Sequence, residues 1–82
     1  MTIQVRFSSG ELMGKLRDGT YDLPENATVA TLMETARQEA DLELTEEQKR
    51  NHIFVFNNSP ATYDTALTDG GKLRVMNKIL GG

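Results

Sequence analysis

The sequence contains no cysteine among its 82 residues. This absence excludes a disulfide framework, a thiol nucleophile and a zinc site built on thiolates. The apolar core must therefore stabilise the fold alone. A chain of this length can build one domain with a small core, and no internal repeat, low-complexity tract or proline-rich linker divides it. We expect a single domain over residues 1–82.

An excess of positive charge is also missing. The formal net charge is −3 and the isoelectric point is about 5.0, whereas a protein that binds nucleic acid needs a net basic surface for the phosphates. No stretch approaches the roughly 18 apolar residues of a membrane span, and residues 1–7 alternate in polarity, unlike a signal peptide. We expect no nucleic-acid partner, no membrane partner and a cytoplasmic location.

No group in the sequence has the spacing of a catalytic or metal site. His52 is the only histidine, and no serine is spaced to form a recognisable triad with it. The Asp-Gly sequences at 18–19 and 69–71 predict turns instead of phosphate-binding loops, because neither leads into a helix with a following lysine and hydroxyl residue. The acidic residues between 43 and 47 lack the spacing of a calcium loop. We therefore predict that the chain is not an enzyme by itself and that it binds no metal.

Hydrophobic periodicity predicts five strands and one main helix. The strands are predicted at residues 2–7, 20–23, 52–57, 66–69 and 72–79. Thr28 can cap a helix whose apolar residues form one stripe, namely Val29, Leu32, Met33, Ala36 and Ala40. Thr45 and Gln48 have the spacing of a capping box before a short helical turn at 46–50, and residues 8–17 fit either a helical turn or an irregular strand. The pattern indicates an α+β fold, with a mixed sheet of four or five strands packed on one helix.

A single helix covers one face of such a sheet and leaves the other face exposed. The strand at 52–57 is apolar on both faces, and periodicity leaves open whether Ile53 and Val55 or the two phenylalanines face outward. An apolar patch rimmed by basic residues has the character of a protein-docking surface. A solvated face with scattered apolar residues is the alternative. The candidate docking residues are Arg6, Phe54, Phe56, Arg74, Met76 and Lys78.

The sequence ends in Gly81 and Gly82. Two glycines make a thin and flexible tail that can enter a narrow channel. When extended, residues 80–82 reach about 10 Å, so the carboxylate of Gly82 can enter another protein's active site. A carboxylate becomes an acyl donor when it attacks the α-phosphate of ATP, and nothing in the chain is suited to bind ATP. We predict Gly82 as the reactive residue, with Leu80 and Gly81 as its tail; an ordinary flexible end is the alternative.

Three stretches resemble a known family, the β-grasp sulfur carriers of the ThiS/MoaD type, which are relatives of ubiquitin. They read ATVATL at 27–32, IFVFNN at 53–58 and TALTDGGKL at 65–73, the last leading to the final diglycine. The resemblance implies a β-grasp (ubiquitin-like) fold and a carrier whose Gly82 is adenylated by an enzyme of the ubiquitin-activating type and converted to a thiocarboxylate. It implies two partners, that enzyme and a sulfur-accepting synthase. The carrier binds no cofactor itself, because the enzyme supplies ATP and the sulfur donor, and we expect a monomer when it is free.

The pathway and the class of carrier stay open. The sulfur could pass to a thiamine thiazole, to molybdopterin or to another metabolite. Residues 76–80 lack the proline found in similar tails of the molybdopterin branch, which weakens that assignment. Compared with carriers of the thiazole branch, the chain has about ten extra residues near 8–17. A ubiquitin-like modifier, joined through Gly82 to lysines of other proteins, would share the activation step. A ubiquitin-like subunit of a larger complex would use only the sheet face and would not need the diglycine.

Overall fold

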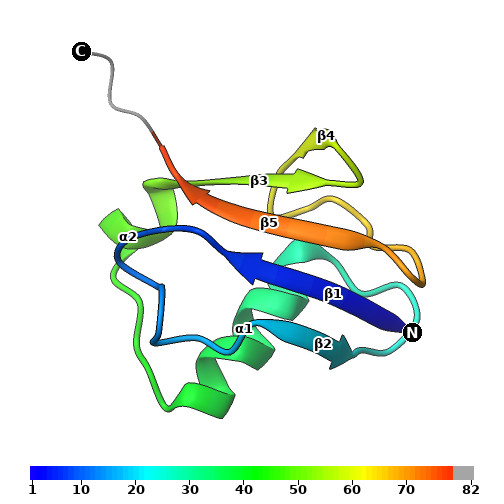
Figure 1. Cartoon of the computed structure of the whole chain (residues 1–82), viewed down its shortest axis with the longest axis horizontal. Coiled ribbons are helices and arrows are strands. Elements are labelled where there is room, and N and C mark those ends of the chain that lie inside the picture. Colours follow the sequence, from blue (N-terminus) through cyan, green and yellow to red (C-terminus); the bar gives the residue numbers. More distant parts are fainter. Residues whose placement is uncertain (79–82) are drawn as a thin grey trace.

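The structure, a computed structural model, describes residues 1–78 of the chain. One helix lies across one face of a five-stranded sheet (Figure 1). A second, short helix at Glu46–Arg50 precedes the strand at His52–Phe56. The elements in chain order are β1 (Thr2–Phe7), β2 (Gly19–Asp22), α1 (Val29–Ala40), α2 (Glu46–Arg50), β3 (His52–Phe56), β4 (Ser59–Ala61) and β5 (Lys72–Asn77). The α+β architecture predicted from the sequence is confirmed.

The last strand is the central one, because the strand order in the sheet is β2-β1-β5-β3-β4. β5 pairs in parallel with β1 and antiparallel with β3, and β2 and β4 add antiparallel edges. Parallel pairing requires a long crossover connection, and the connection from β1 to β5 includes α1. This central strand leads directly into the last residues of the chain.

Helix α1 begins where the sequence predicts. The side-chain oxygen of Thr28 accepts the backbone N–H of Thr31, and the hydroxyl of Thr31 accepts the N–H of Thr28, which closes a capping box. At the other end, Asp41 adopts a left-handed conformation with φ of 52°. The helix buries Val29, Leu32, Met33 and Ala36. Ala40, the last residue of the predicted stripe, is exposed.

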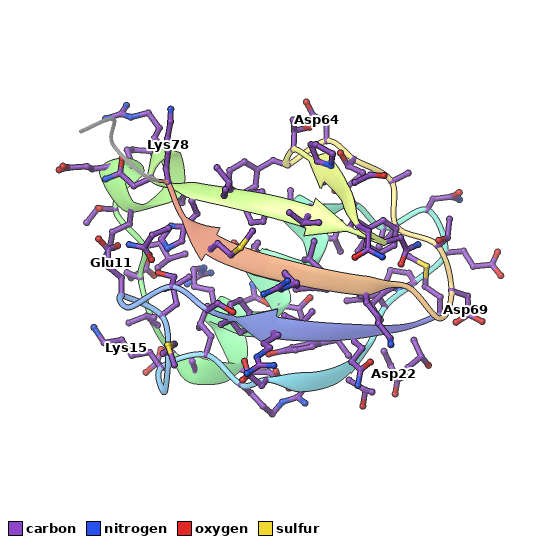
Figure 2. The ribbon with its side chains drawn as sticks, turned by 45° about the horizontal axis from the view of Figure 1, so that its top comes forward. Glu11, Lys15, Asp22, Asp64, Asp69 and Lys78 are labelled. Carbon is purple, nitrogen blue, oxygen red and sulfur yellow. The ribbon has the colours of Figure 1, made fainter. Side chains whose placement is uncertain are left out.

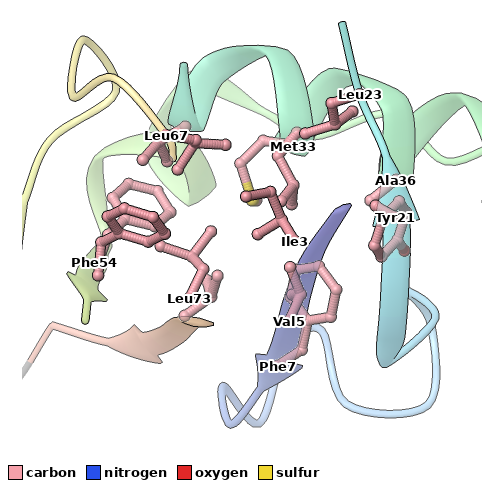
Figure 3. Close-up of a cluster of buried hydrophobic side chains, with 14 of the residues drawn as sticks. Ile3, Val5, Phe7, Tyr21, Leu23, Met33, Ala36, Phe54, Leu67 and Leu73 are labelled. Carbon is pink, nitrogen blue, oxygen red and sulfur yellow. The ribbon is translucent and has the colours of Figure 1, made fainter. Parts of the chain in front are cut away.

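The apolar core fills the space between α1 and the sheet (Figure 3). β1 alternates between exposed and buried residues, and its buried side chains are Ile3, Val5 and Phe7. Burying one such side chain contributes about 1.5–3 kcal/mol. No element among residues 1–78 covers the opposite face of the sheet (Figure 1), so the prediction of one open face is confirmed.

The fourth strand is not where the sequence predicts it. Residues 66–69 do not form a strand, and Ala66 makes only an isolated bridge to Thr28. The strand is instead β4, joined to β3 by a two-residue turn at Asn57 and Asn58, both with positive φ. Asparagine tolerates this conformation, which type I′ hairpin turns require. The proline in β4 is compatible with a strand at the edge of the sheet.

The predicted turn at 69–71 fixes the start of β5 beside β1. A carboxylate oxygen of Asp69 accepts the backbone N–H of Thr2 at 2.7 Å, and the N–H of Gly70 donates to the carbonyl of Thr2. Gly70 has a φ of +80° and Gly71 is buried. The Asp-Gly-Gly turn therefore holds the start of β5 against β1 through hydrogen bonds to Thr2.

Residues 8–17 form helical turns and not an irregular strand. The N–H groups of Met13 and Leu16 donate to the carbonyls of Ser9 and Leu12, four residues earlier in each case. Gly14, with a φ of +76°, lies within the second of these turns. Within residues 1–78, no helix has the length and apolar character needed to cross a membrane.

Candidate functional site

The end of β5 is anchored on both sides. The N–H of Lys78 donates to the carbonyl of Asn51 at 2.6 Å, and the N–H of Ser8 donates to the carbonyl of Val75 at 2.7 Å. Lys78 is exposed, and Figure 2 shows it at the end of β5. The predicted tail, Leu80, Gly81 and Gly82, lies outside the described residues, and its role stays a prediction.

The structure brings three of the predicted docking residues onto the open face. Arg6 of β1 and Arg74 of β5 are register partners in the parallel pair, and both are exposed. Met76 lies two residues further along β5 and is half-buried. Lys78 follows beyond the end of the strand. Arg74 and Met76 therefore follow each other along one face of β5, with Arg6 beside Arg74.

Phe54 and Phe56 of β3, which are among the candidate docking residues predicted from the sequence, do not lie on this face, so that part of the prediction is wrong. Phe54 is 4% exposed and Phe56 is 8% exposed, both within the core. The physical reason is the register, because Phe54 lies opposite Val75 and Phe56 opposite Leu73, which are themselves core residues. Directly paired residues of neighbouring strands share one face of a sheet.

Ile53 and Val55 take the place of the phenylalanines on the open face. Ile53 is 42% exposed and lies opposite Met76, and Val55 is half-buried and lies opposite Arg74. Sequence reasoning left this pair as an alternative, since β3 is apolar at every position from 53 to 56. The informative signal lies in β5, where the buried parity is unambiguous.

A groove of about 710 Å³ lies over the open face. Its lining includes Arg6, Arg74 and Val55, together with Lys72, which sequence reasoning missed. Lys72 lies opposite Gln4 in the register of β1 and β5. Its position after the Gly-Gly turn, on the same parity as Arg74, is the signal that could have identified it. The groove therefore combines positively charged and apolar side chains.

No set of three or more histidine, aspartate or glutamate side chains within residues 1–78 is arranged to hold a metal ion. Among residues 1–78, the groove is lined by one carboxylate, that of Asp18, whose Oδ1 accepts the backbone N–H of Phe7 at 2.8 Å. This carboxylate therefore already has a structural partner. Cationic, amide and apolar side chains therefore make up most of the lining.

Solved structures of other proteins share this architecture. Small archaeal modifier protein 1 of H. volcanii matches with a TM-score of 0.69 and 18% sequence identity, over 95% of this chain and 98% of that chain. Putative molybdopterin converting factor, subunit 1, from Pyrococcus furiosus matches with a TM-score of 0.71 and 19% identity, over 96% and 99%. A protein-protein complex of subunits 1 and 2 of molybdopterin-converting factor from Helicobacter pylori 26695 matches with a TM-score of 0.57 and 18% identity, over 100% of both chains. No protein-family model and no curated protein matches the sequence.

The chain has the β-grasp fold. The resemblance predicted from the sequence is thereby confirmed at the level of structure, since its structural neighbours include molybdopterin converting factor subunit 1 and a small archaeal modifier protein. In this β-grasp chain, the central strand β5 contributes Arg74 and Met76 to the open face and ends at Asn77.

The β-grasp domain also contains a buried serine and histidine pair that sequence reasoning missed. Ser9 Oγ lies 2.7 Å from His52 Nε2, and both residues are buried. His52 Nδ1 hydrogen-bonds with the carbonyl of Gln48, and Ser9 Oγ accepts the N–H of Glu11. A carbonyl only accepts, so Nδ1 carries the proton and Nε2 accepts from Ser9. The hydrogen bond between Ser9 and His52 holds residues 8–17 against the start of β3, so we interpret the pair as structural.

Proposed function

We propose that the chain is a sulfur carrier whose chemistry takes place at the α-carboxylate of Gly82. The observation that carries the proposal is the Gly81 and Gly82 pair that follows β5 in sequence, on a fold shared with a molybdopterin converting factor subunit 1. The open face beside β5 supports it, because a carrier must be held by the enzyme that acts on its tail.

The proposed reaction has two steps, both in the active site of a partner enzyme of the ubiquitin-activating type. In the first, an oxygen of the Gly82 carboxylate attacks the α-phosphate of ATP, and pyrophosphate leaves. In the second, sulfide attacks the acyl carbonyl, the bond to AMP breaks, and a thiocarboxylate remains at Gly82. The sulfur then passes to an accepting synthase. The partner binds the ATP, the magnesium and the sulfur donor, and this chain is the substrate of the partner instead of an enzyme.

Exclusion of water explains why such chemistry would use a thin tail. An acyl adenylate is labile to hydrolysis, so its reactive atom must be enclosed by the enzyme. Five residues, 78–82, follow Asn77, the last residue of β5, and five fully extended residues span at most about 18 Å. The globular domain can therefore remain outside the cleft while the carboxylate enters it.

The test is intact-mass spectrometry of the untagged protein after incubation with ATP, a candidate adenylating enzyme and a sulfide donor. The proposal expects the mass gain that corresponds to the exchange of one oxygen for sulfur, located at Gly82 by fragmentation. Omission of ATP is the matched control and should abolish the gain. The candidate enzyme must first be shown to be active on another carrier; an unchanged mass of this chain would then count against activation by that class of enzyme. A Gly82→Ala variant that is fully functional in cells would overturn the proposal.

A second function is favoured by a different observation, the likeness to a small archaeal modifier protein. A modifier would share the adenylation step, and a lysine amine of another protein would then attack the carbonyl of Gly82. The two functions differ only in the nucleophile. Adducts between the Gly82 carboxyl and lysine side chains, found by digestion and mass spectrometry of a cell extract, would assign the modifier function, and thiocarboxylate without adducts would assign the carrier function.

A further inference from the structure

Two arginines on the open face lie directly opposite each other. In the parallel register of β1 and β5, Arg6 pairs with Arg74, and Gln4 pairs with Lys72. Like charges at directly opposite positions of a sheet are destabilising. The arrangement therefore costs stability, and a structural role does not account for it.

None of these cations is neutralised within the part of the chain that the structure describes. The ion pairs among residues 1–78 involve Arg17, Arg37 and Lys49, and they do not involve Arg6, Lys72 or Arg74. The whole chain has a net charge of −3, so the charge of this face is opposite to that of the molecule. A concentration of unpaired cations on an acidic protein is typical of a binding surface.

The groove between these side chains has room for a segment of polypeptide. Its volume is about 710 Å³, and amide side chains from Gln4, Asn57 and Asn58 line it beside the cations. The one carboxylate in the lining, Asp18, accepts a backbone N–H. Within the described part of the chain, the groove therefore presents three cations and several hydrogen-bond donors against a single carboxylate.

Apolar side chains continue the surface toward the end of β5. Val55 lies opposite Arg74, and Ile53 lies opposite Met76. A small inorganic anion or a phosphate backbone would leave these side chains without a partner, and the overall negative charge of the chain opposes a polyanion. The combination of cations with a neighbouring apolar strip fits a protein segment that contains both carboxylates and an apolar side chain.

We propose that this groove binds an acidic segment of a partner protein, in which carboxylates contact Arg6 and Arg74 and a neighbouring apolar side chain packs on Val55 and Ile53. Guanidinium groups and carboxylates match in bidentate geometry, which gives such contacts strength and direction. The inference rests on the proposed function only for the identity of the partner, which is the activating enzyme. The docking chemistry itself does not involve Gly82.

The test is an NMR titration of the full, ¹⁵N-labelled chain with short synthetic peptides in which leucine alternates with glutamate, glutamine or lysine. The glutamate peptide should shift the amide signals of Arg6, Val55, Lys72 and Arg74, and the other two peptides should not. The double variant Arg6→Gln, Arg74→Gln should bind the glutamate peptide about two- to thirtyfold more weakly, as expected for two exposed ion pairs. About 1 M salt, with a screening length of about 3 Å, should also weaken it.

A matched double variant controls for the change in net charge. Lys15→Gln, Arg50→Gln removes two exposed cations that do not line the groove, and it should bind the glutamate peptide as the unmodified chain does. Reversal of charge gives a stronger test, because Arg6→Glu, Arg74→Glu should bind the lysine peptide in place of the glutamate peptide. The dispersion of each variant's spectrum reports whether it is folded.

Three results would overturn the assignment of the groove. These are equal shifts with the glutamate and glutamine peptides, shifts confined to other surfaces, or tighter binding of inorganic pyrophosphate than of the glutamate peptide at the same amides. The titration uses no ATP, enzyme or sulfur donor, so its failure leaves the proposed reaction at Gly82 intact. Conversely, a failed mass assay with a positive titration would overturn the reaction and keep the docking chemistry.

Discussion

A Cβ atom at Gly71 would stand 2.2 Å from Cζ of Phe56. Gly71 therefore has no room for any side chain, and the aromatic ring of β3 packs directly on the backbone at the start of β5. The ring of Phe56, which the register with β5 turns inward, occupies the space that a side chain at position 71 would need. This also explains why the Asp-Gly-Gly turn needs its second glycine.

We expect Gly71→Ala to lower the free energy of unfolding by about 1–3 kcal/mol, the usual cost of overpacking a core. Urea unfolding followed by circular dichroism measures it. Gly10→Ala is the matched control, since no atom lies within 4 Å of its added Cβ, and its effect should stay within about 0.5 kcal/mol. Introducing Phe56→Leu should reduce the cost of Gly71→Ala, because the two changes share one contact; strictly additive effects would contradict this explanation.

The two neighbouring arginines of the open face predict an unusual stability effect. Arg6→Gln should raise the free energy of unfolding by about 0.2–1 kcal/mol, because it removes the like charge opposite Arg74. The gain should shrink at high salt, which screens exposed charges. Lys15→Gln makes the same change in net charge at an exposed site, and it should not stabilise the chain. Urea unfolding at low and high salt would contradict the explanation if both variants behaved alike.

The sequence predicts those features of the fold that depend on local chemistry. The alternation of β1, the cap at Thr28 and the turn at 69–71 each follow from residues close together in the chain. The orientation of β3 does not, because the strand is apolar on both faces and only its register with β5 turns Phe54 inward. The position of β4 depends on the positive φ of Asn57 and Asn58, which asparagine permits but does not require.

In the candidate site too, the features that depend on local sequence could be predicted, and those that depend on distant contacts could not. Arg6, Arg74 and Met76 could be placed on the open face from strand parity, since a single helix leaves one face uncovered. The contact between Ser9 and His52 could not be predicted, because 43 residues separate the two side chains in sequence and no motif marks them. The groove likewise arises from residues of four strands, β1, β2, β3 and β5, that meet only in the folded sheet.

The buried hydrogen bond between Ser9 and His52 should contribute to the free energy of unfolding. Ser9→Ala should lower the free energy of unfolding by about 1–3 kcal/mol, the cost of leaving a buried polar atom, here Nε2 of His52, without a partner. Ser8→Ala is the matched control, because Ser8 is exposed and bonds to Val75 through its backbone N–H alone. Chemical unfolding of both variants provides the measurement, and equal stabilities would contradict a structural role for the pair.

The two tyrosines should ionise at unusually high pH. Burial raises the pKa of Tyr21 above its ordinary value of 10.0, with Arg17 opposing this in part. Burial, aided by the carboxylate of Glu46, also raises the pKa of Tyr63. Each hydroxyl donates to a backbone carbonyl, that of Arg17 and that of Lys49 respectively. Because each group binds its proton more tightly when folded, its stabilisation is complete below pH 10 and is lost as the pH rises through the folded pKa.

Ultraviolet absorbance of tyrosinate measures this directly, since the chain has two tyrosines and no tryptophan. The folded protein should titrate above pH 10, and the protein unfolded in urea should titrate at the ordinary value. Tyr21→Phe and Tyr63→Phe assign the two steps. A folded protein in which either tyrosine titrates with the unfolded curve would show that its hydroxyl is not shielded.

Changes in the predicted tail, residues 80–82, and changes on the open face should affect the proposed activation by the partner enzyme in different ways. Deletion of Gly82 should abolish acyl transfer while leaving the melting temperature nearly unchanged, since terminal residues contribute little to stability unless they are held in place. Arg6→Gln, Arg74→Gln should instead raise the KM for this chain as substrate by about two- to thirtyfold. Its kcat should be unchanged, because docking contacts are made equally in the ground state and the transition state. Steady-state kinetics of ATP-pyrophosphate exchange with the activating enzyme would separate the two effects. A lowered kcat in the arginine variant would mean that the open face also positions the tail for reaction.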